Sequence, residues 1–211
     1  MSEQWIHKTL RNFREKRMRG FEHEFRVTDR TRILDIGGTP LNWSLLTCRP
    51  RVTILNLPRA QERLDQPNLT FVAGDGCRLP FAAGSFDIAF ANSVIEHVGG
   101  GAQQAFAREV ARVAPRYYVQ TPNRWFPVEQ HLLTPFLHYL PGSWQRVIAP
   151  RFTVWALIAR PSPDRRDYYL RHILDEVRLL DAARMRALFP EAAIATERFL
   201  GLPKSVIAIR R

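Results

Sequence analysis

The feature that most constrains the fold of this chain is a series of short apolar runs, each ending in small or polar residues. Continuous apolar runs of about four to eight residues are typical of strands buried on both faces of a sheet. The segment 102–114 has helical periodicity instead. Strands that alternate with helices in this way predict a parallel, doubly wound α/β sheet. The runs cover residues 31–36, 51–57, 69–73, 86–91 and 116–120.

Two further apolar runs, 193–198 and 204–210, follow a predicted helix over 179–189. Only a short segment containing Gly201 and Pro203 separates them. Because a connection this short joins antiparallel neighbours, we expect the otherwise parallel, seven-stranded sheet to finish with an antiparallel last strand.

The chain has 211 residues and a mass of 24.5 kDa, which fits a single domain, 1–211, since domains typically hold about 100–200 residues. Within it, residues 1–29 predict an N-terminal helical segment with Trp5, Leu10, Phe13, Phe21 and Phe25 on one face, as one helix or as a pair broken near Gly20. Residues 122–170 combine many prolines and aromatic residues with weak periodicity. We expect this segment to be a lid-like insertion.

Polar or small residues follow four successive predicted strands. In an open α/β sheet, ligands bind beyond the carboxyl ends of the strands. Each residue taken alone is explained as a turn residue, but four successive ends with this chemistry predict a ligand pocket. These residues are Asp35 with Gly37 and Gly38, Asn56 with Leu57, Asp75 with Gly76, and Asn92 with Ser93.

Three stretches of the sequence that contain most of these residues resemble the class I S-adenosylmethionine-dependent methyltransferases of the small type 11 group. They are residues 33–38, 74–90 and 92–97. The resemblance covers about residues 30–121 and implies a Rossmann-like methyltransferase fold with S-adenosylmethionine as cofactor. It places the Gly37–Gly38 turn under the methionine part, with Asp35 near the amino group and Asn92 and Ser93 on the same side. It also implies that Asp75 accepts a bond from the adenine amine and that Gly76 lies beside the ring. Asn56 and Leu57 complete the predicted cofactor-binding set.

The chain departs from this family pattern at two positions. Thr39 stands where a second glycine is usual, and Asn56 replaces the carboxylate that receives both ribose hydroxyls. An amide can accept a bond from one hydroxyl and donate to the other, without the added strength of a charged acceptor. A dehydrogenase would carry GxGxxG after the first strand, and this chain does not.

Two histidines are candidate catalytic residues, because methyl transfer to an alcohol requires a base whose pKa lies near the working pH. His131 follows the strand 116–120 together with Asn123 and Glu129, and we predict it as the base ahead of His97, which follows Glu96. The alternative role of His97 is packing or capping. Glu129 and His131 also resemble part of a metal site, but two ligands without a third are insufficient, so we predict no metal.

The predicted acceptor is a small-molecule or lipid-like compound methylated on oxygen. The net charge of +11 favours an anionic partner, and the aromatic, arginine-containing insertion suits peripheral contact with an anionic membrane as well as a core of its own. A nucleic-acid methyltransferase is one alternative, disfavoured because no Asn/Asp-Pro-Pro-Tyr/Phe motif follows residues 86–91. A non-catalytic binding module is the other, favoured by Thr39 and Asn56.

The sequence also predicts a cytoplasmic protein. No apolar run approaches the roughly 20 residues that a membrane span needs, and the charged N-terminus does not resemble a secretory signal. The two cysteines, Cys48 and Cys77, stand in unrelated contexts without a CxxC spacing, which excludes a disulfide framework or a thiolate zinc site.

Overall fold

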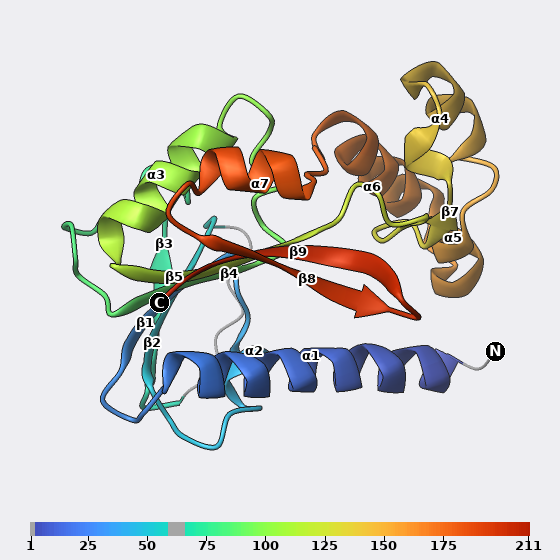
Figure 1. Cartoon of the computed structure of the whole chain (residues 1–211). Helices are drawn as coiled ribbons and strands as arrows, with labels where there is room; N and C mark the ends of the chain where they lie inside the picture. Colours follow the sequence, from blue (N-terminus) through green and yellow to red (C-terminus); the bar gives the residue numbers. More distant parts are fainter. Residues whose placement is uncertain (1–2, 59–65) are drawn as a thin grey trace.

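The computed structural model describes residues 3–58 and 66–211 of the chain (Figure 1). Its centre is a seven-stranded sheet in the order β3-β2-β1-β4-β5-β9-β8. Neighbours from β3 to β5 pair in parallel, whereas β9 is antiparallel to both β5 and β8. The predicted sheet, mostly parallel with an antiparallel last strand, is therefore confirmed. The strands are β1 Arg32–Ile36, β2 Arg51–Asn56, β3 Leu69–Ala73, β4 Ile88–Asn92, β5 Arg116–Pro122, β8 Ala193–Phe199 and β9 Leu202–Arg210.

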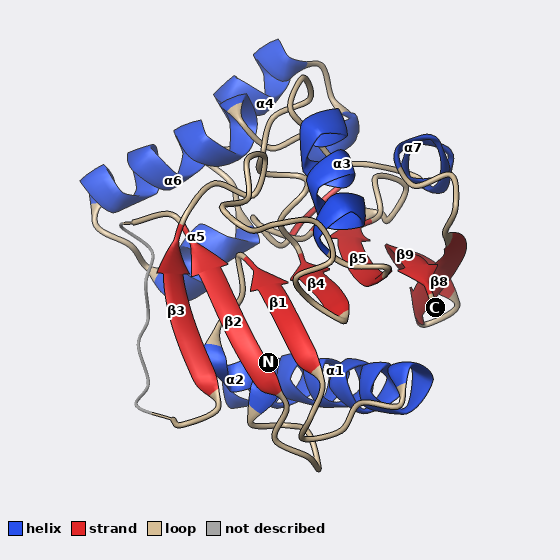
Figure 2. Ribbon diagram, turned by 90° about the vertical axis from the view of Figure 1, so that its left-hand side faces the viewer, coloured by secondary structure: helices blue, strands red, loops and turns tan. Residues whose placement is uncertain are grey.

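Helices cover both faces of this sheet (Figures 1 and 2). The helices α1 (Glu3–Phe25) and α2 (Pro40–Trp43) lie on one face, and α3 (Gln103–Val113) and α7 (Ala182–Leu188) lie on the other. The buried apolar residues form a separate core on each side, one containing residues of α1 and the other residues of α3 and α7. The sheet is thereby buried on both faces, as its continuous apolar strands require.

Helix α1 is continuous through Gly20, so the predicted break near this residue is wrong. The side chains of Met18, Phe21 and Phe25 are buried under the sheet, and the ring centroid of Phe21 lies 5.0 Å from that of Phe90. A glycine in a helix costs only about 1 kcal/mol relative to alanine, and burial of these side chains outweighs that cost. Trp5 and Leu10, which the sequence also assigned to this face, lie outside the residues whose side chains are described.

The segment between β5 and α7 contains short elements that gather at one end of the molecule (Figure 1). Its own small core is formed by Leu132, Leu137, Ala149, Leu170 and Ile173, while many of its aromatic residues are exposed. The helical part continues five residues beyond residue 170, to Asp175. The elements are β6 Val128–Glu129, β7 Thr134–Pro135, the 3-10 helix Leu137–Tyr139, α4 Gly142–Ile148, α5 Val154–Ala159 and α6 Pro163–Asp175.

The helices and the two cysteines can be compared with the sequence predictions about membrane spans and disulfides. In the part of the chain that the structure describes, every helix is too short or too polar to span a lipid bilayer. Cys48 and Cys77 are both free thiols, as their unrelated sequence contexts predict.

The packing of α1 on the sheet is tested by Phe21→Ala. The side chain of Phe21 is 1% exposed, and truncating a buried phenylalanine typically costs about 3–5 kcal/mol. We expect the free energy of unfolding, measured in urea, to fall by an amount in this range. Phe152→Ala is the control, since this ring is 70% exposed and surface changes usually stay within about 0.5 kcal/mol. Equal effects of the two substitutions would contradict the observed packing.

Candidate functional site

A cavity of about 430 Å³ lies at the carboxyl ends of β1, β2 and β3. Figure 2 shows the arrowheads of these strands directed toward the side where α6 lies. The volume falls within the range of about 300–1,000 Å³ that is usual for small-molecule and cofactor pockets. Five of the residues predicted from strand ends line it: Gly37, Asn56, Leu57, Asp75 and Gly76.

Gly37 forms the part of the wall where the chain leaves β1. Its φ angle is +71°, and an added Cβ would lie 2.6 Å from Cγ2 of Val94. The N–H of Gly37 donates to the carbonyl of Leu55 at 2.7 Å. The left-handed backbone and the close contact with Val94 both exclude a side chain at position 37. The cavity is therefore not filled at this part of its wall.

Asn56 connects the end of β2 to the same turn. Its amide nitrogen donates to the carbonyl oxygen of Gly38 at 2.8 Å. A carboxylate could not donate this hydrogen bond, so the structure gives a physical reason for an amide where the family pattern has an acid. Asp75 stands two residues after the end of β3. Its Oδ1 accepts from the backbone N–H of Cys77 at 2.8 Å.

The other predicted cofactor residues do not line the cavity. Asp35 is fully buried, and its Oδ2 accepts from the indole N–H of Trp43 at 2.7 Å. A Cβ on Gly38 would lie 1.7 Å from this carboxylate, so the glycine is required by the packing of Asp35. Asn92 accepts from the guanidinium of Arg17 at 2.7 Å, and the Ser93 hydroxyl is 3.1 Å from Oε1 of Gln120. These side chains are therefore engaged in contacts within the protein instead of lining the cavity.

The two predicted catalytic histidines lie next to each other, and one of them belongs to the cavity wall. His97 lines the cavity wall, and its ring centroid is 5.0 Å from that of His131. Nδ1 of His131 is 2.7 Å from Oε1 of Glu129, as their spacing in the sequence suggests. Asn123, which was grouped with them, instead donates to the carbonyl of Pro203 and accepts from the N–H of Trp125.

Sequence reasoning missed Glu96 as a functional residue. This side chain is 0% exposed, lies in the histidine cluster, and accepts from the Thr121 hydroxyl at 3.0 Å. His172 was also missed, and its ring stacks on that of His97 at 5.4 Å. The only sequence signal for Glu96 was its position next to His97.

Burial and neighbouring charges shift the pKa values of this cluster in opposite directions. Burial raises the pKa of Glu96 to about 7. Burial, followed by the nearby His131 and His172, lowers the pKa of His97 to about 4. Burial by itself disfavours a charged His131, but the hydrogen bond to Glu129 and the charges of Glu129 and Glu96 raise its pKa above the usual range. The arrangement therefore favours a neutral ring at His97 and an ion pair between His131 and Glu129.

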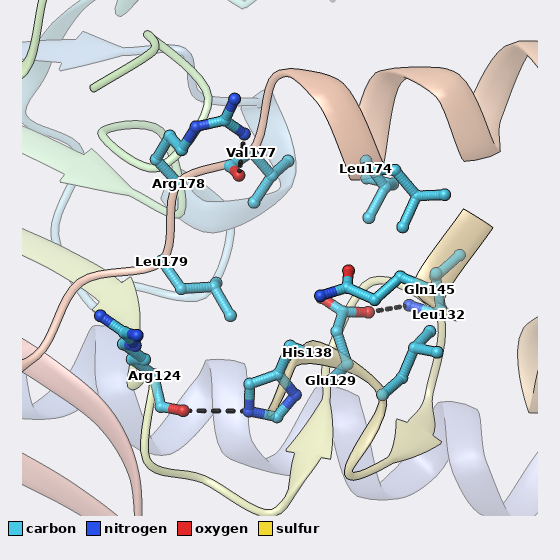
Figure 3. Close-up of a pocket in the computed structure, with 11 residues that line it drawn as sticks. Arg124, Glu129, Leu132, His138, Gln145, Leu174, Val177, Arg178 and Leu179 are labelled. Atoms are coloured by element: carbon cyan, nitrogen blue, oxygen red, sulfur yellow. Dashed lines mark hydrogen bonds between the residues drawn. The ribbon is translucent and has the colours of Figure 1, made fainter. Parts of the chain in front are cut away.

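A second cavity of about 310 Å³ lies on the side of Glu129 that faces the insertion (Figure 3). Figure 3 shows Arg124 and Arg178 on one side of it and Gln145 with Leu132 on the other. The N–H of Leu132 donates to Oε2 of Glu129 at 2.5 Å, and Nε2 of His138 is 2.9 Å from the carbonyl oxygen of Arg124. Because Glu129 also contacts His131, it separates this second cavity from the histidine cluster.

Comparison with known proteins identifies a domain family and the fold. Residues 52–116 match the family described as "Methyltransferase domain". No curated protein shows significant sequence similarity to the chain.

Solved structures share the fold at low sequence identity. The magnesium protoporphyrin IX methyltransferase of Synechocystis, with bound SAH, is 15% identical with a TM-score of 0.55, over 95% of this chain and 83% of that one. A SAM-dependent methyltransferase from Aquifex aeolicus is 11% identical with a TM-score of 0.51, over 90% and 86%. A Rhodobacter sphaeroides protein, described provisionally as a Zn-dependent alcohol dehydrogenase, is 13% identical with a TM-score of 0.55, over 87% and 84%. These likenesses establish the fold.

The buried carboxyl of Asp35 predicts a pH dependence of stability. Burial raises the pKa of Asp35 to about 7 from its usual 3.8. The folded chain therefore holds a proton that the unfolded chain has lost, and stability falls as the pH rises from about 4 to about 7, by up to roughly 1.4 kcal/mol per pH unit. Asp35→Asn stays neutral and keeps an oxygen for Trp43. Urea unfolding across this range should show a flatter profile for the variant, and parallel profiles would contradict the shift.

Proposed function

Because this chain contains a methyltransferase domain with the class I, S-adenosylmethionine-dependent fold, we propose that it transfers a methyl group from S-adenosylmethionine to an oxygen of a small or lipid-like acceptor. The observation that carries the proposal is the cavity at the ends of β1 to β3, with His97 in its wall and the ring of His131 next to that of His97. A cofactor cavity beside groups that can bind and move protons is the arrangement that methylation of a hydroxyl requires.

The residues around the cavity fit this cofactor. The open Gly37 turn leaves room for the backbone to approach a ligand, Asn56 and Asp75 offer polar atoms, and Leu57 and Val98 offer apolar contacts. The buried Oδ1 of Asp35 has no hydrogen-bond partner among the described residues, and the ammonium group of a bound cofactor would favour the ionised form of this carboxyl, whose pKa burial raises to about 7. When bound, S-adenosylmethionine supplies a methyl group on a positively charged sulfur.

The His97 and His131 side chains are assigned the activation of the acceptor oxygen. His97 borders the cofactor cavity, while His131 lies behind it and is oriented by Glu129. Transfer forms a carbon–oxygen bond and breaks the carbon–sulfur bond. The acceptor proton passes to the neutral ring of His97, and the ion pair of His131 with Glu129 stabilises the negative charge on the acceptor oxygen. For this role neither histidine has to contact the residues predicted to bind adenine, Asp75 and Gly76.

The insertion is assigned the role of a cover over the acceptor. It contributes Glu129, His138 and Gln145 to the second cavity, whose arginines Arg124 and Arg178 suit an acceptor with an anionic or strongly polar group. Apolar side chains on its outside, including Trp144, Phe152 and Leu157, are exposed. Together with neighbouring arginines such as Arg151, they support peripheral contact with an anionic membrane that presents a lipid-like acceptor.

Cofactor binding is tested by Gly37→Ala. The new methyl group would lie 2.6 Å from Val94 in a left-handed backbone, which should distort the wall of the cavity. Calorimetry should show at least about tenfold weaker binding of S-adenosylhomocysteine, roughly 1.4 kcal/mol. Gly84→Ala is the matched control, because Gly84 has a φ of +65° and open space around it. Equal affinities in both variants would contradict the assigned cavity, and no binding by the wild-type chain would favour the non-catalytic module.

Methyl transfer is tested with isotope-labelled S-adenosylmethionine and separate aqueous, lipid and nucleic-acid fractions of a cell extract. We expect a labelled product in the aqueous or lipid fraction, which is 14 daltons heavier than the acceptor when unlabelled S-adenosylmethionine is used, with the lipid product increased on anionic vesicles. His131→Ala should lower turnover by about 10²–10⁴-fold and leave cofactor affinity unchanged. His23→Ala, on the exposed surface of α1, should retain full activity. Label in nucleic acid alone would overturn the proposed acceptor class.

A further inference from the structure

Three potential metal ligands converge beside the cofactor cavity. An oxygen of Glu96 and ring nitrogens of His97 and His131 all lie within 4.8 Å of one another. Glu96 and His97 follow β4, whereas His131 belongs to the turn between β6 and β7. The insertion thus contributes one potential ligand, His131, and the segment after β4 contributes the other two.

Two polar atoms of this cluster are buried without a hydrogen-bond partner among the residues that the structure describes. They are Oε1 of Glu96, whose side chain is 0% exposed, and Nδ1 of His97. Leaving a buried polar atom unpaired costs about 1–3 kcal/mol, so such atoms are rare in native structures. Oε1 carries lone pairs, as does Nδ1 when the ring proton is on Nε2, and a single bound cation would then satisfy both atoms.

The other polar atoms of His131 and Glu96 form hydrogen bonds of the kind that ligands form in metal centres. Nδ1 of His131 is bonded to Glu129 at 2.7 Å, which directs Nε2 to the other side of the ring. Oε2 of Glu96 accepts from Thr121 at 3.0 Å, which leaves Oε1 free. Histidines that bind metals usually donate their second N–H to a carboxylate in this way, and carboxylate ligands are in turn hydrogen-bonded.

We propose that Glu96, His97 and His131 bind one divalent transition-metal ion at the wall of the cofactor cavity. Two imidazoles and one carboxylate suit ions such as Zn²⁺ and Co²⁺, whereas Mg²⁺ and Ca²⁺ prefer oxygen ligands throughout. The donor set is that of catalytic zinc sites with two histidines and a glutamate, in which a further coordination position stays open.

The open position gives the ion a role in the proposed transfer. An acceptor hydroxyl bound there would lose its proton to solvent water more readily, because the ion stabilises the resulting oxyanion. His131 then acts as a ligand rather than as the base expected from the sequence. This role rests on the proposed methyl transfer, whereas binding of the ion requires neither cofactor nor acceptor.

The experiment uses the full chain, stripped with a chelator and desalted, and titrated with Co²⁺ or Zn²⁺ alone. Calorimetry and the visible absorption of Co²⁺ should show one ion per chain, confirmed by elemental mass spectrometry. Glu96→Gln and His131→Ala should weaken binding at least tenfold. Glu129→Gln, which leaves all three ligands in place, should weaken it by about 10–100-fold.

His138→Ala is the matched control, since this histidine also belongs to the insertion but lies outside the cluster. It should bind the ion as the wild type does. Circular dichroism of the metal-free variants establishes that they fold, and if one does not, the Glu129→Gln result decides. A folded wild type without stoichiometric binding would overturn the proposal, as would binding that every cluster variant retains. Methyl transfer by the metal-free chain would overturn only the role of the ion and leave the proposed function intact.

Discussion

The parallel pairing of β1 with β2 and β4 is the constraint on which the rest of the site depends. Ile36 pairs with Leu55 on one side and with Ala91 on the other, so the three strands end at the same level. Parallel strands direct all their carboxyl ends to one edge of the sheet. The glycine turn, the Asn56 amide and the loop that carries His97 therefore meet around one cavity, although they are far apart in the chain.

Buried carboxyl groups concentrate the chemistry of the molecule at this edge. Asp35, Glu96 and Glu129 are all buried, and burying a charge is costly unless it is paired. Each has a different partner: an indole N–H for Asp35, a hydroxyl for Glu96 and a histidine for Glu129. The first two retain an unpaired oxygen among the described residues. A buried polar atom without a partner is rare in a native structure and calls for an explanation.

Local pattern predicted some elements better than others. The strands β2, β3 and β8 lie within a residue of their expected bounds, because continuous apolar runs bounded by turn residues leave little choice of state. The expected break of α1 at Gly20 was wrong, since helix propensity is a small term beside the burial of Phe21 and Phe25. In the insertion, weak periodicity did not reveal that Leu132 and Leu170 form its core while Trp144 and Phe152 remain exposed.

The sequence by itself determined the fold class and the edge of the sheet at which the cavity lies, because the alternation of strands with helices and the strand-end residues follow from local pattern and from the rules of parallel sheets. It also identified the Glu129–His131 pair, whose members are two residues apart. Only the tertiary structure decided which strand-end side chains line the cavity and which do not, since burial depends on packing across the sheet. It alone brought His131 to Glu96 and His97, because that contact joins segments more than 30 residues apart and no local pattern encodes such a distance.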